Sequence, residues 1–326
     1  MGRIYNSITE LVGNTPLVRL HRYEKEVGAK GHILAKFEYF NPTGSLKDRA
    51  ALNMIIEAEY DGRLRPGMTI LEATSGNTGI AEAAFANAMG YKFATIIQPL
   101  VSEERTQILK AMGAEILDPF SIPNLIEAMK DGMDMDALEE VLTAYARERG
   151  WFYISQLENP ANVRAHFIGT GPEIWEDTGG RVDYAVQMAG TGGTLAGLSA
   201  YLRGKNPDIR IIGAQPAIES LKNLDHPERN TIDGVLRFTG VEERFYPYLF
   251  KYFRTHYDEC LDVLAEQAYE TGRKLALTEG FFVGQSSGAA LWAATQIAKR
   301  PEAEGRNIVT ILADNAFKYL STNMYK

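Results

Sequence analysis

The sequence predicts an α/β protein with two open, mostly parallel twisted sheets flanked by helices. Three observations support this fold class. The 326 residues suffice for two domains, short apolar runs alternate with helical patterns from about residue 32 onward, and the helical patterns end near glycines such as Gly62, Gly90 and Gly113. Such βαβ units give a parallel sheet, which binds its ligands at the carboxyl ends of the strands.

In the first half of the chain, the expected strands are HILAKFE (32–38), MTILEAT (68–74), FATII (93–97) and AEIL (114–117). The expected helices are residues 47–60, a stretch after Asn77, and residues 102–112. Residues 121–150 are mainly polar helix by the same criterion.

The alternation of strands and helices then restarts with WFYIS (151–155), VDYAVQMA (182–189), IRIIGAQ (209–215) and NIVTIL (307–312). We therefore predict a smaller N-terminal domain of residues 1–150 and a larger C-terminal domain of residues 151–326. A segment near residues 13–35 is expected to cross to the other domain. Residues 216–257 have no clear period and are expected to form a long connection.

Composition and charge indicate a small-molecule partner. The net charge of -8 is spread along the chain without a basic stripe, so we expect neither nucleic-acid nor membrane binding. We also expect no metal site. The single cysteine, Cys260, indicates a reducing compartment, with a buried inert thiol favoured over a catalytic one. Residues 1–12 lack an apolar signal segment and no later run is long enough to span a membrane, so we expect a cytoplasmic protein.

The segment NPTGSLKDR (41–49) places Lys47 in the first turn of a helix, directly after a strand and a turn. A cation at this position opposes the helix dipole, which favours the neutral amine that condenses with an aldehyde. A solvated lysine followed by ordinary capping acids would produce the same pattern.

Three further strand-to-helix corners could bind a ligand. TSGNTG (74–79) gathers hydroxyls, an amide and backbone N–H groups, which suits a carboxylate, although a structural turn of small residues would look similar. GTGGT (190–194) lets a phosphate approach a helix N-terminus; a dinucleotide is the rival ligand, but the spacing is not GxGxxG, so a single phosphate fits better. In GQSSG (284–288), a serine could also simply cap the next helix.

In this order, NPTGSLKDR, TSGNTG, GTGGT and SSG resemble the motifs of the cysteine synthase family of fold-type II pyridoxal-phosphate enzymes, which includes cystathionine β-synthases. The likeness runs from GNTPL (13–17) through ENPAN (158–162) and TGPE (170–173) to YLST (319–322). It implies pyridoxal 5'-phosphate in the cleft between the domains, an amino-acid substrate, a homodimer, and an N-terminal lobe that closes over the substrate.

The resemblance also implies roles for individual residues. Lys47 would form the Schiff base, Asn77 would bond the ring hydroxyl of the cofactor, and Ser286, or else its neighbour Ser287, would face the pyridine nitrogen. The phosphate would be held by Gly190, Thr191, Gly192, Gly193 and Thr194. The substrate carboxylate would be bound by Thr74, Ser75, Asn77, Thr78 and Gln156.

The implied reaction takes place at the β-carbon of cysteine or an O-activated serine. Lys47 removes the α-proton, the leaving group departs to give an α-aminoacrylate, and a nucleophile adds to the β-carbon. Hydrogen sulfide is then a substrate or a product, and hydrolysis without addition gives pyruvate and ammonia. A serine hydroxyl at the ring nitrogen makes a milder electron sink than a carboxylate, which favours loss of a β-group over transamination.

The sequence departs from the family at IDGVLRF (232–238), where the resemblance leads us to expect a turn of the type I-Q-G-I-G. Asp233 would repel hydrosulfide by roughly 1 to 4 kcal/mol at close range, or it could activate water as a general base. Sulfide would then be removed from cysteine, with serine or pyruvate as the product. The alternative is that Asp233 points to solvent or binds Arg237.

Two other departures lie beside the expected cofactor ring. ADNAFKY (313–319) replaces a common P-D-S-G-E-R-Y, and Gln285 replaces an aliphatic residue. Arg105, Arg237 and Lys318 could serve an acidic or phosphorylated substrate, although surface cations are common.

Several functions are compatible with these motifs. Cysteine synthesis competes with cysteine desulfhydration, and cystathionine formation ranks third. Serine or threonine dehydratases share the fold type, but TSGNTG resembles the cysteine synthase branch more closely. A non-catalytic family member that acts as a binding partner is disfavoured by the retention of Lys47, Asn77, the phosphate loop and Ser286.

Overall fold

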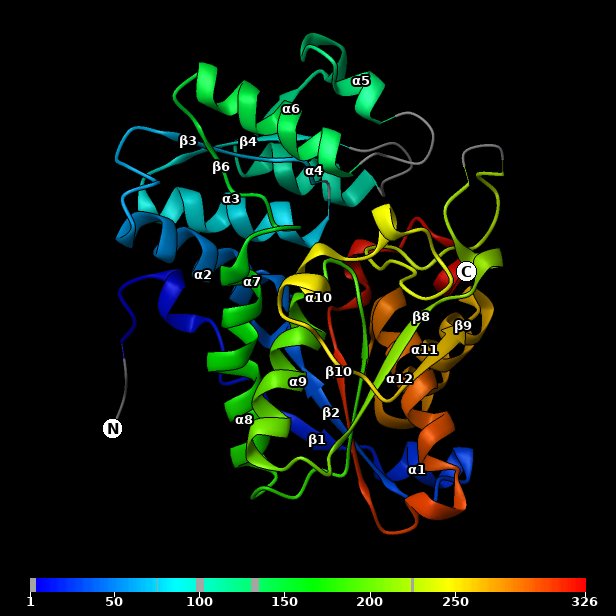
Figure 1. Ribbon diagram of the computed structural model, residues 1–326. Coiled ribbons are helices and arrows are strands. Elements are labelled where there is room, and N and C mark those ends of the chain that lie inside the picture. The colour runs from blue at the N-terminus through cyan, green and yellow to red at the C-terminus, as the bar shows by residue number, and fades with distance from the viewer. Residues whose placement is uncertain (1–3, 75, 98–102, 130–134, 224–225) are drawn as a thin grey trace.

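The computed structural model describes residues 4–74, 76–97, 103–129, 135–223 and 226–326 (Figure 1). Their strands form a six-stranded sheet of order β1-β2-β10-β7-β8-β9 and a four-stranded sheet of order β5-β4-β3-β6. Strand β1 pairs antiparallel with β2, and the other neighbouring strands are parallel. The predicted fold class, two mostly parallel sheets flanked by helices, is confirmed.

The strands of the six-stranded sheet are β1 (Leu17–Arg19), β2 (His32–Phe37), β10 (Asn307–Leu312), β7 (Tyr184–Met188), β8 (Arg210–Pro216) and β9 (Glu259–Val263). Those of the four-stranded sheet are β5 (Glu115–Leu117), β4 (Lys92–Ile96), β3 (Thr69–Glu72) and β6 (Phe152–Tyr153). The central strands are buried over almost their whole length, as both faces of a parallel sheet are covered by helices.

The helices of the N-terminal half are α1 (His21–Val27), α2 (Lys47–Tyr60), α3 (Asn77–Met89), α4 (Glu103–Ala111), α5 (Leu125–Ala128) and α6 (Met135–Glu148). Those of the C-terminal half are α7 (Pro160–Ala165), the π-helix η5 (His166–Thr170), α8 (Gly171–Asp177), α9 (Gly193–Lys205), α10 (Tyr248–Tyr252), α11 (Ala265–Glu279) and α12 (Gln285–Ala298). Short 3-10 turns are η1 (Ile8–Leu11), η2 (Glu38–Phe40), η3 (Pro119–Ser121), η6 (Ile218–Ser220), η7 (Glu243–Phe245), η8 (Pro301–Ala303), η9 (Ala316–Lys318) and η10 (Asn323–Tyr325). Among the described residues, none of these helices is both long and apolar enough to cross a bilayer.

Alternation along β10 divides the core of the larger sheet into two layers. Ile308 and Leu312 pack with α1, α11 and α12 on one face, whereas Val309 and Ile311 pack with α8, α9 and α10 on the other. The smaller sheet is covered in the same way, by α2, α3 and α4 on one face and by α5 and α6 on the other. Figure 1 shows the smaller sheet above the carboxyl ends of β7, β8 and β10.

Sheet membership does not follow the boundary expected near residue 150. Strand β6, which lies after that boundary, pairs with β3 of the smaller sheet through Ile70 and Phe152. Conversely, β1 and β2 lie in the larger sheet, where β2 pairs with β10 from His32 to Phe37. The position of the domain boundary itself stays a prediction, but any division has to assign both segments to the sheet with which they pair.

A buried ion network connects α2 to the larger sheet. Arg49 of α2 donates to Glu38, which follows β2, at 2.7 Å, and to Glu173 of α8 at 2.7 Å. Lys36 of β2 lies 2.9 Å from the second oxygen of Glu173. Burial would raise the pKa of Glu173, but hydrogen bonds and charge from Arg49, with the charge of Lys36, lower it to about 2. The network fixes the first turn of α2.

We expect Arg49→Met to lower the free energy of unfolding by about 3 to 5 kcal/mol, because it leaves the carboxylate of Glu38 buried without its partner. Urea denaturation measures this change. Arg63→Met is the matched control, because its pair with Asp61 is exposed and should contribute less than about 1 kcal/mol. Equal destabilisation by both substitutions would contradict a special role for the network.

Candidate active site

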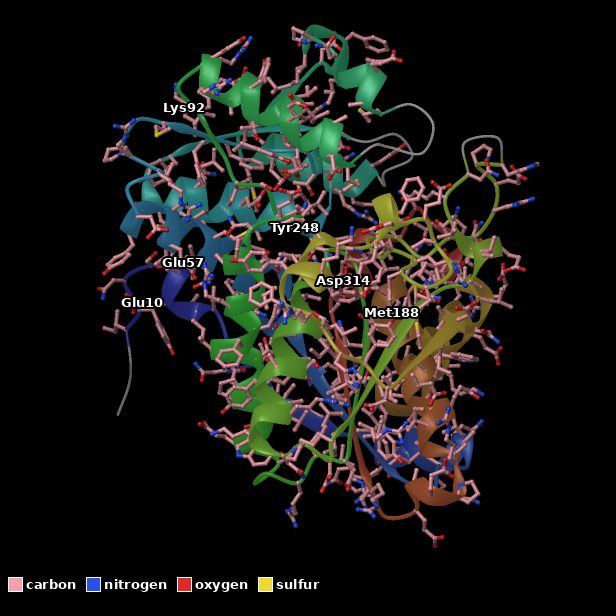
Figure 2. The ribbon with its side chains drawn as sticks, in the orientation of Figure 1. Glu10, Glu57, Lys92, Met188, Tyr248 and Asp314 are labelled. Carbon is pink, nitrogen blue, oxygen red and sulfur yellow. The ribbon has the colours of Figure 1, made fainter. Side chains whose placement is uncertain are left out.

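A cavity of about 530 Å³ lies between the carboxyl ends of the larger sheet and the loops of the smaller one. Its walls include Lys47, Asn77, Ser286 and the loop 190–194, so the four motifs that lie far apart in the sequence converge here. Figure 2 labels Met188 and Asp314, which lie at the ends of β7 and β10 nearest to the smaller sheet. The convergence follows from parallel strands, whose carboxyl ends share one edge.

Lys47 is the first residue of α2, and its backbone N–H is 3.3 Å from Ser45 Oγ. Burial lowers the pKa of its ammonium, while the negative charge of Asp314 opposes this shift. The helix N-terminus adds a further unfavourable interaction with a positive charge. Both effects favour the neutral amine, which is the nucleophilic form.

The loop 190–194 precedes α9 and has the shape of an anion cradle. Gly192 has φ of +92°, and a Cβ atom at Gly190 would lie 2.5 Å from the carbonyl oxygen of Gly234, so both positions require glycine. The first turn of α9 presents backbone N–H groups without partners in the helix. Thr191 Oγ1 accepts from Asn162 at 2.9 Å, and Thr194 Oγ1 lies 3.1 Å from His166 Nε2.

Asn77 begins α3 and has partners from the C-terminal part of the chain. Its Nδ2 donates to Asp314 Oδ2 at 2.7 Å, and its Oδ1 accepts from Lys318 Nζ at 2.8 Å. Asp314 also accepts from the Tyr319 hydroxyl at 2.5 Å. Burial lowers the pKa of Lys318, against the opposing charges of Asp314 and Asp48.

The two serines of GQSSG have different surroundings. Ser286 lines the cavity. Ser287 is completely buried, and its Oγ lies 3.2 Å from both the backbone nitrogen and the backbone oxygen of Asp314. The structure therefore presents Ser286 to the cavity, and Ser287 holds the strand end that carries Asp314.

Thr74, Thr78 and Gln156 also line the cavity, and Ser75 lies outside the described residues. Thr78 Oγ1 donates to Gln156 Oε1 at 2.7 Å. The Gln156 backbone N–H donates to Glu72 Oε2 at 2.7 Å, and burial raises the pKa of Glu72 to about 8. Sequence reasoning missed Glu72, although a carboxyl at the end of a strand otherwise buried and apolar was a usable signal.

Asp233 is buried at the cavity wall and points neither to solvent nor to Arg237. Its carboxylate lies 3.0 Å from Arg105 and 3.3 Å from Lys222. Its backbone N–H donates to Gln285 Oε1 at 2.9 Å. The alternative in which Asp233 is solvated or bound to Arg237 is therefore wrong, because Arg105 and Lys222 bring two other cations to it.

The other residues that the sequence suggested for substrate binding or catalysis lie in different parts of the structure. Arg105 lines the cavity and stacks 4.7 Å from the centre of the Tyr319 ring. Arg237 is paired with Asp262 at 2.9 Å. Cys260 lies on β9, and burial raises its thiol pKa to about 12, so a reactive thiolate is disfavoured.

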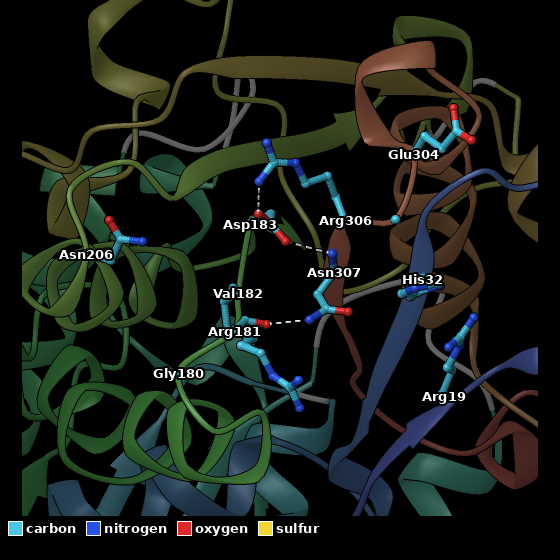
Figure 3. A pocket seen from close by; sticks show the side chains of 11 residues that line it. Arg19, His32, Gly180, Arg181, Val182, Asp183, Asn206, Glu304, Arg306 and Asn307 are labelled. Atoms are coloured by element: carbon cyan, nitrogen blue, oxygen red, sulfur yellow. Dashed lines mark hydrogen bonds and ion pairs between the residues drawn. The ribbon is translucent and has the colours of Figure 1, made fainter.

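A second cavity, of about 790 Å³, lies at the opposite edge of the larger sheet (Figure 3). Its walls come from the amino ends of the strands and include His32, Asp183 and Asn307. Asp183 bonds Arg306 and the Asn307 backbone, both at 2.8 Å. No residue of the four motifs lines this cavity. In parallel sheets, ligands bind at the carboxyl ends of the strands, which lie on the other side of the sheet from this cavity.

The residues around the first cavity fit a phosphorylated aldehyde cofactor. Its lining includes a desolvated amine, a glycine loop at a helix N-terminus, a serine hydroxyl and a side-chain amide. This donor set matches the aldehyde, phosphate, ring nitrogen and ring hydroxyl of pyridoxal 5'-phosphate.

The chain is similar to known proteins over nearly its whole length. A family model described as pyridoxal-phosphate dependent enzyme matches residues 8–314. Cysteine synthase from Aquifex aeolicus is 38% identical, over 98% of this chain and 92% of that protein. The crystal structure of O-ureido-L-serine synthase has a TM-score of 0.82 at 34% identity and covers 99% of this chain and 96% of its own. The crystal structure of a hydrogen sulfide-producing enzyme from Fusobacterium nucleatum has a TM-score of 0.80 at 32% identity. The match covers 98% of this chain and 99% of that chain.

These similarities extend across both sheets and all four motifs of the cavity. The cofactor of this enzyme is pyridoxal 5'-phosphate. The chain belongs to the cysteine synthase family of fold-type II pyridoxal-phosphate-dependent enzymes.

Proposed function

We propose that this enzyme carries out β-replacement or β-elimination on cysteine or an O-activated serine, in the manner of a cysteine synthase, with hydrogen sulfide as substrate or product. The main observation is the convergence of Lys47, Asn77, Ser286 and the loop 190–194 on one cavity. The similarity to cysteine synthase of Aquifex aeolicus and to the sulfide-producing enzyme of Fusobacterium nucleatum supports the same chemistry.

Lys47 is proposed to have two functions. Bound pyridoxal phosphate withdraws electron density from the α-carbon of an amino acid joined to its aldehyde. The neutral Nζ of Lys47 attaches the resting cofactor and, once released, takes the α-proton as a general base. The lowered pKa of Lys47 in its desolvated position suits both functions.

Thr74, Ser75, Asn77, Thr78 and Gln156 are proposed to bind the substrate carboxylate. The N-terminus of α3 offers unpartnered N–H groups and a favourable dipole to this anion. The bond between Thr78 and Gln156 joins the two segments of this wall, and Glu72 holds the Gln156 backbone behind it.

Ser286 is proposed to meet the pyridine nitrogen, because it faces the cavity and Ser287 does not line it. A hydroxyl does not hold a proton on that nitrogen as a carboxylate would. With Ser286 at that position, bound pyridoxal phosphate would be a milder electron sink, which would favour departure of the β-substituent over transamination.

A second candidate function is cysteine desulfhydration with serine as the product. Asp233 supports it, because its carboxylate lies at the cavity wall and is kept in place by Arg105 and Lys222. A fixed carboxylate can accept a proton from a water that attacks the β-carbon. Arg105 and Lys222 offset the repulsion that this carboxylate would otherwise exert on hydrosulfide, so its support for this function lies in its position and not in its charge. When no water adds to the β-carbon, the three-carbon product is released and one water hydrolyses it to pyruvate and ammonia.

We expect Lys47→Ala to lower turnover by at least about 10³-fold, because both the attachment of the cofactor and the base are lost. Borohydride reduction of the wild-type holoenzyme, followed by peptide mass spectrometry, should place the cofactor on Lys47. Lys222→Arg is the control, since Lys222 also lines the cavity. A cofactor reduced onto any other lysine would refute the proposed active site.

We expect Asp233→Asn to lower serine formation from cysteine by about 10² to 10⁴-fold, while pyruvate still forms, because the substitution removes a base and not the cofactor chemistry. Product analysis of the purified enzyme with cysteine alone measures both. Asp262→Asn is the matched control, as this carboxylate also pairs with an arginine but lies outside the cavity. Unchanged serine output from Asp233→Asn would reject its role as a base.

We also propose a cytoplasmic homodimer, on the strength of the resemblance and of the single cysteine, Cys260. Exposed apolar side chains could contribute to a dimer interface. They include Tyr60 and Ile168, with 92% and 64% of their surface accessible. Light scattering coupled to gel filtration should give twice the 36.2 kDa of one chain. A mass of one chain at micromolar concentration would contradict this assembly.

A further inference from the structure

The side-chain amide of Asn77 lies between two groups that can hydrogen-bond in one sense only. Lys318 Nζ can only donate, and it lies 2.8 Å from Asn77 Oδ1. Asp314 Oδ2 accepts a hydrogen bond from Asn77 Nδ2 at 2.7 Å and a second one from the Tyr319 hydroxyl. A flipped amide would face the ammonium with its NH₂ group and the carboxylate with its oxygen, so it would lose both bonds.

The orientation of this amide determines what Asn77 offers to the cavity. Its NH₂ group carries two hydrogens, and Asp314 takes one of them. The other N–H remains for a ligand in the cavity that Asn77 lines. With the amide reversed, the cavity would meet a carbonyl oxygen, which cannot donate to an oxygen of the cofactor ring.

We infer that Lys318 is a positioning residue that locks the Asn77 amide with its N–H toward the ring oxygen of the cofactor. This inference rests on the proposed contact between Asn77 and that oxygen. Lys318 acts through Asn77, because Lys318 itself is buried and does not line the cavity. Lys318 is the last residue of η9, a short turn that follows β10 near the end of the sequence. It contacts Asn77, the first residue of α3.

The remaining partners of Lys318 explain why its ammonium stays fixed. It donates to the backbone oxygen of Thr43 at 2.9 Å, which ties it to the turn just before Lys47. Burial lowers the pKa of Lys318, and the negative charges of Asp314 and Asp48 oppose that shift. One cation therefore connects the turn that precedes Lys47 with the amide of Asn77.

The test compares absorption spectra of the holoenzymes and cofactor affinities of the reconstituted apoenzymes. Lys318→Met should change the visible band of the bound cofactor and weaken binding by on the order of tenfold, the effect of one lost charged hydrogen bond. Lys318→Arg should keep the wild-type spectrum, because a guanidinium also only donates. Asn77→Ala should match Lys318→Met, and the double variant should show no further change.

Arg300→Met is the control for loss of a paired cation away from the cofactor. Arg300 donates to both carboxylate oxygens of Glu259 on β9, at 2.8 and 2.6 Å, and lies outside the cavity wall. This variant should lose thermal stability and keep the spectrum. A spectral change as large as that of Lys318→Met would show that general destabilisation is responsible, and would overturn the inference.

The outcomes separate the inference from the proposed function. If Asn77→Ala alters the spectrum and Lys318→Met does not, the role of Lys318 is rejected while that of Asn77 stands. If Asn77→Ala leaves spectrum and affinity unchanged, the proposed contact fails, and the inference with it. Should Lys318→Met not fold, Lys318→Leu replaces it, because an aliphatic side chain likewise has no donor for Asn77 Oδ1; a wild-type spectrum would then reject the inference.

Discussion

The position of Lys47 relative to the phosphate loop depends on the buried ion network of Arg49, Glu38, Glu173 and Lys36. Lys47 belongs to a helix that packs on the smaller sheet, whereas the loop 190–194 belongs to the larger one. Arg49 lies two residues after Lys47 and bonds carboxylates from the larger sheet and its covering helix. Because the charges are buried, the bonds are weakly screened, and α2 is held firmly at its first turn.

Burial has opposite consequences for the ionisable groups near the cavity. It lowers the pKa of Lys47, where few compensating contacts exist, so the amine is available as a nucleophile. Glu72, which holds the Gln156 backbone, shows the opposite shift, because burial raises the pKa of its carboxyl to about 8. Desolvation thus acts against the charged form of both groups.

The departures from the family motifs are connected in space. Gln285 accepts from the Asp233 backbone and donates to the Tyr269 hydroxyl at 2.9 Å, so the unusual glutamine supports the unusual aspartate. Lys318, in the ADNAFKY segment that departs from the family motif, contacts Asn77 of the TSGNTG segment, which resembles the family motif. Substitutions that appear separate in the sequence therefore act on two neighbouring parts of one site.

Apolar periodicity and glycine-rich turns are local signals, so the α/β class, the extent of the helix 47–60 and the corners at which ligands bind could be predicted from the residues alone. These signals did not predict β9, a short edge strand that is only partly buried, or the helix α11 that follows it. The contacts of the folded chain were needed to place β6 in the smaller sheet, to show which serine lines the cavity, and to show which cations hold Asp233. These features depend on contacts between distant segments, and no local pattern records which partner a buried charge or a strand edge will find.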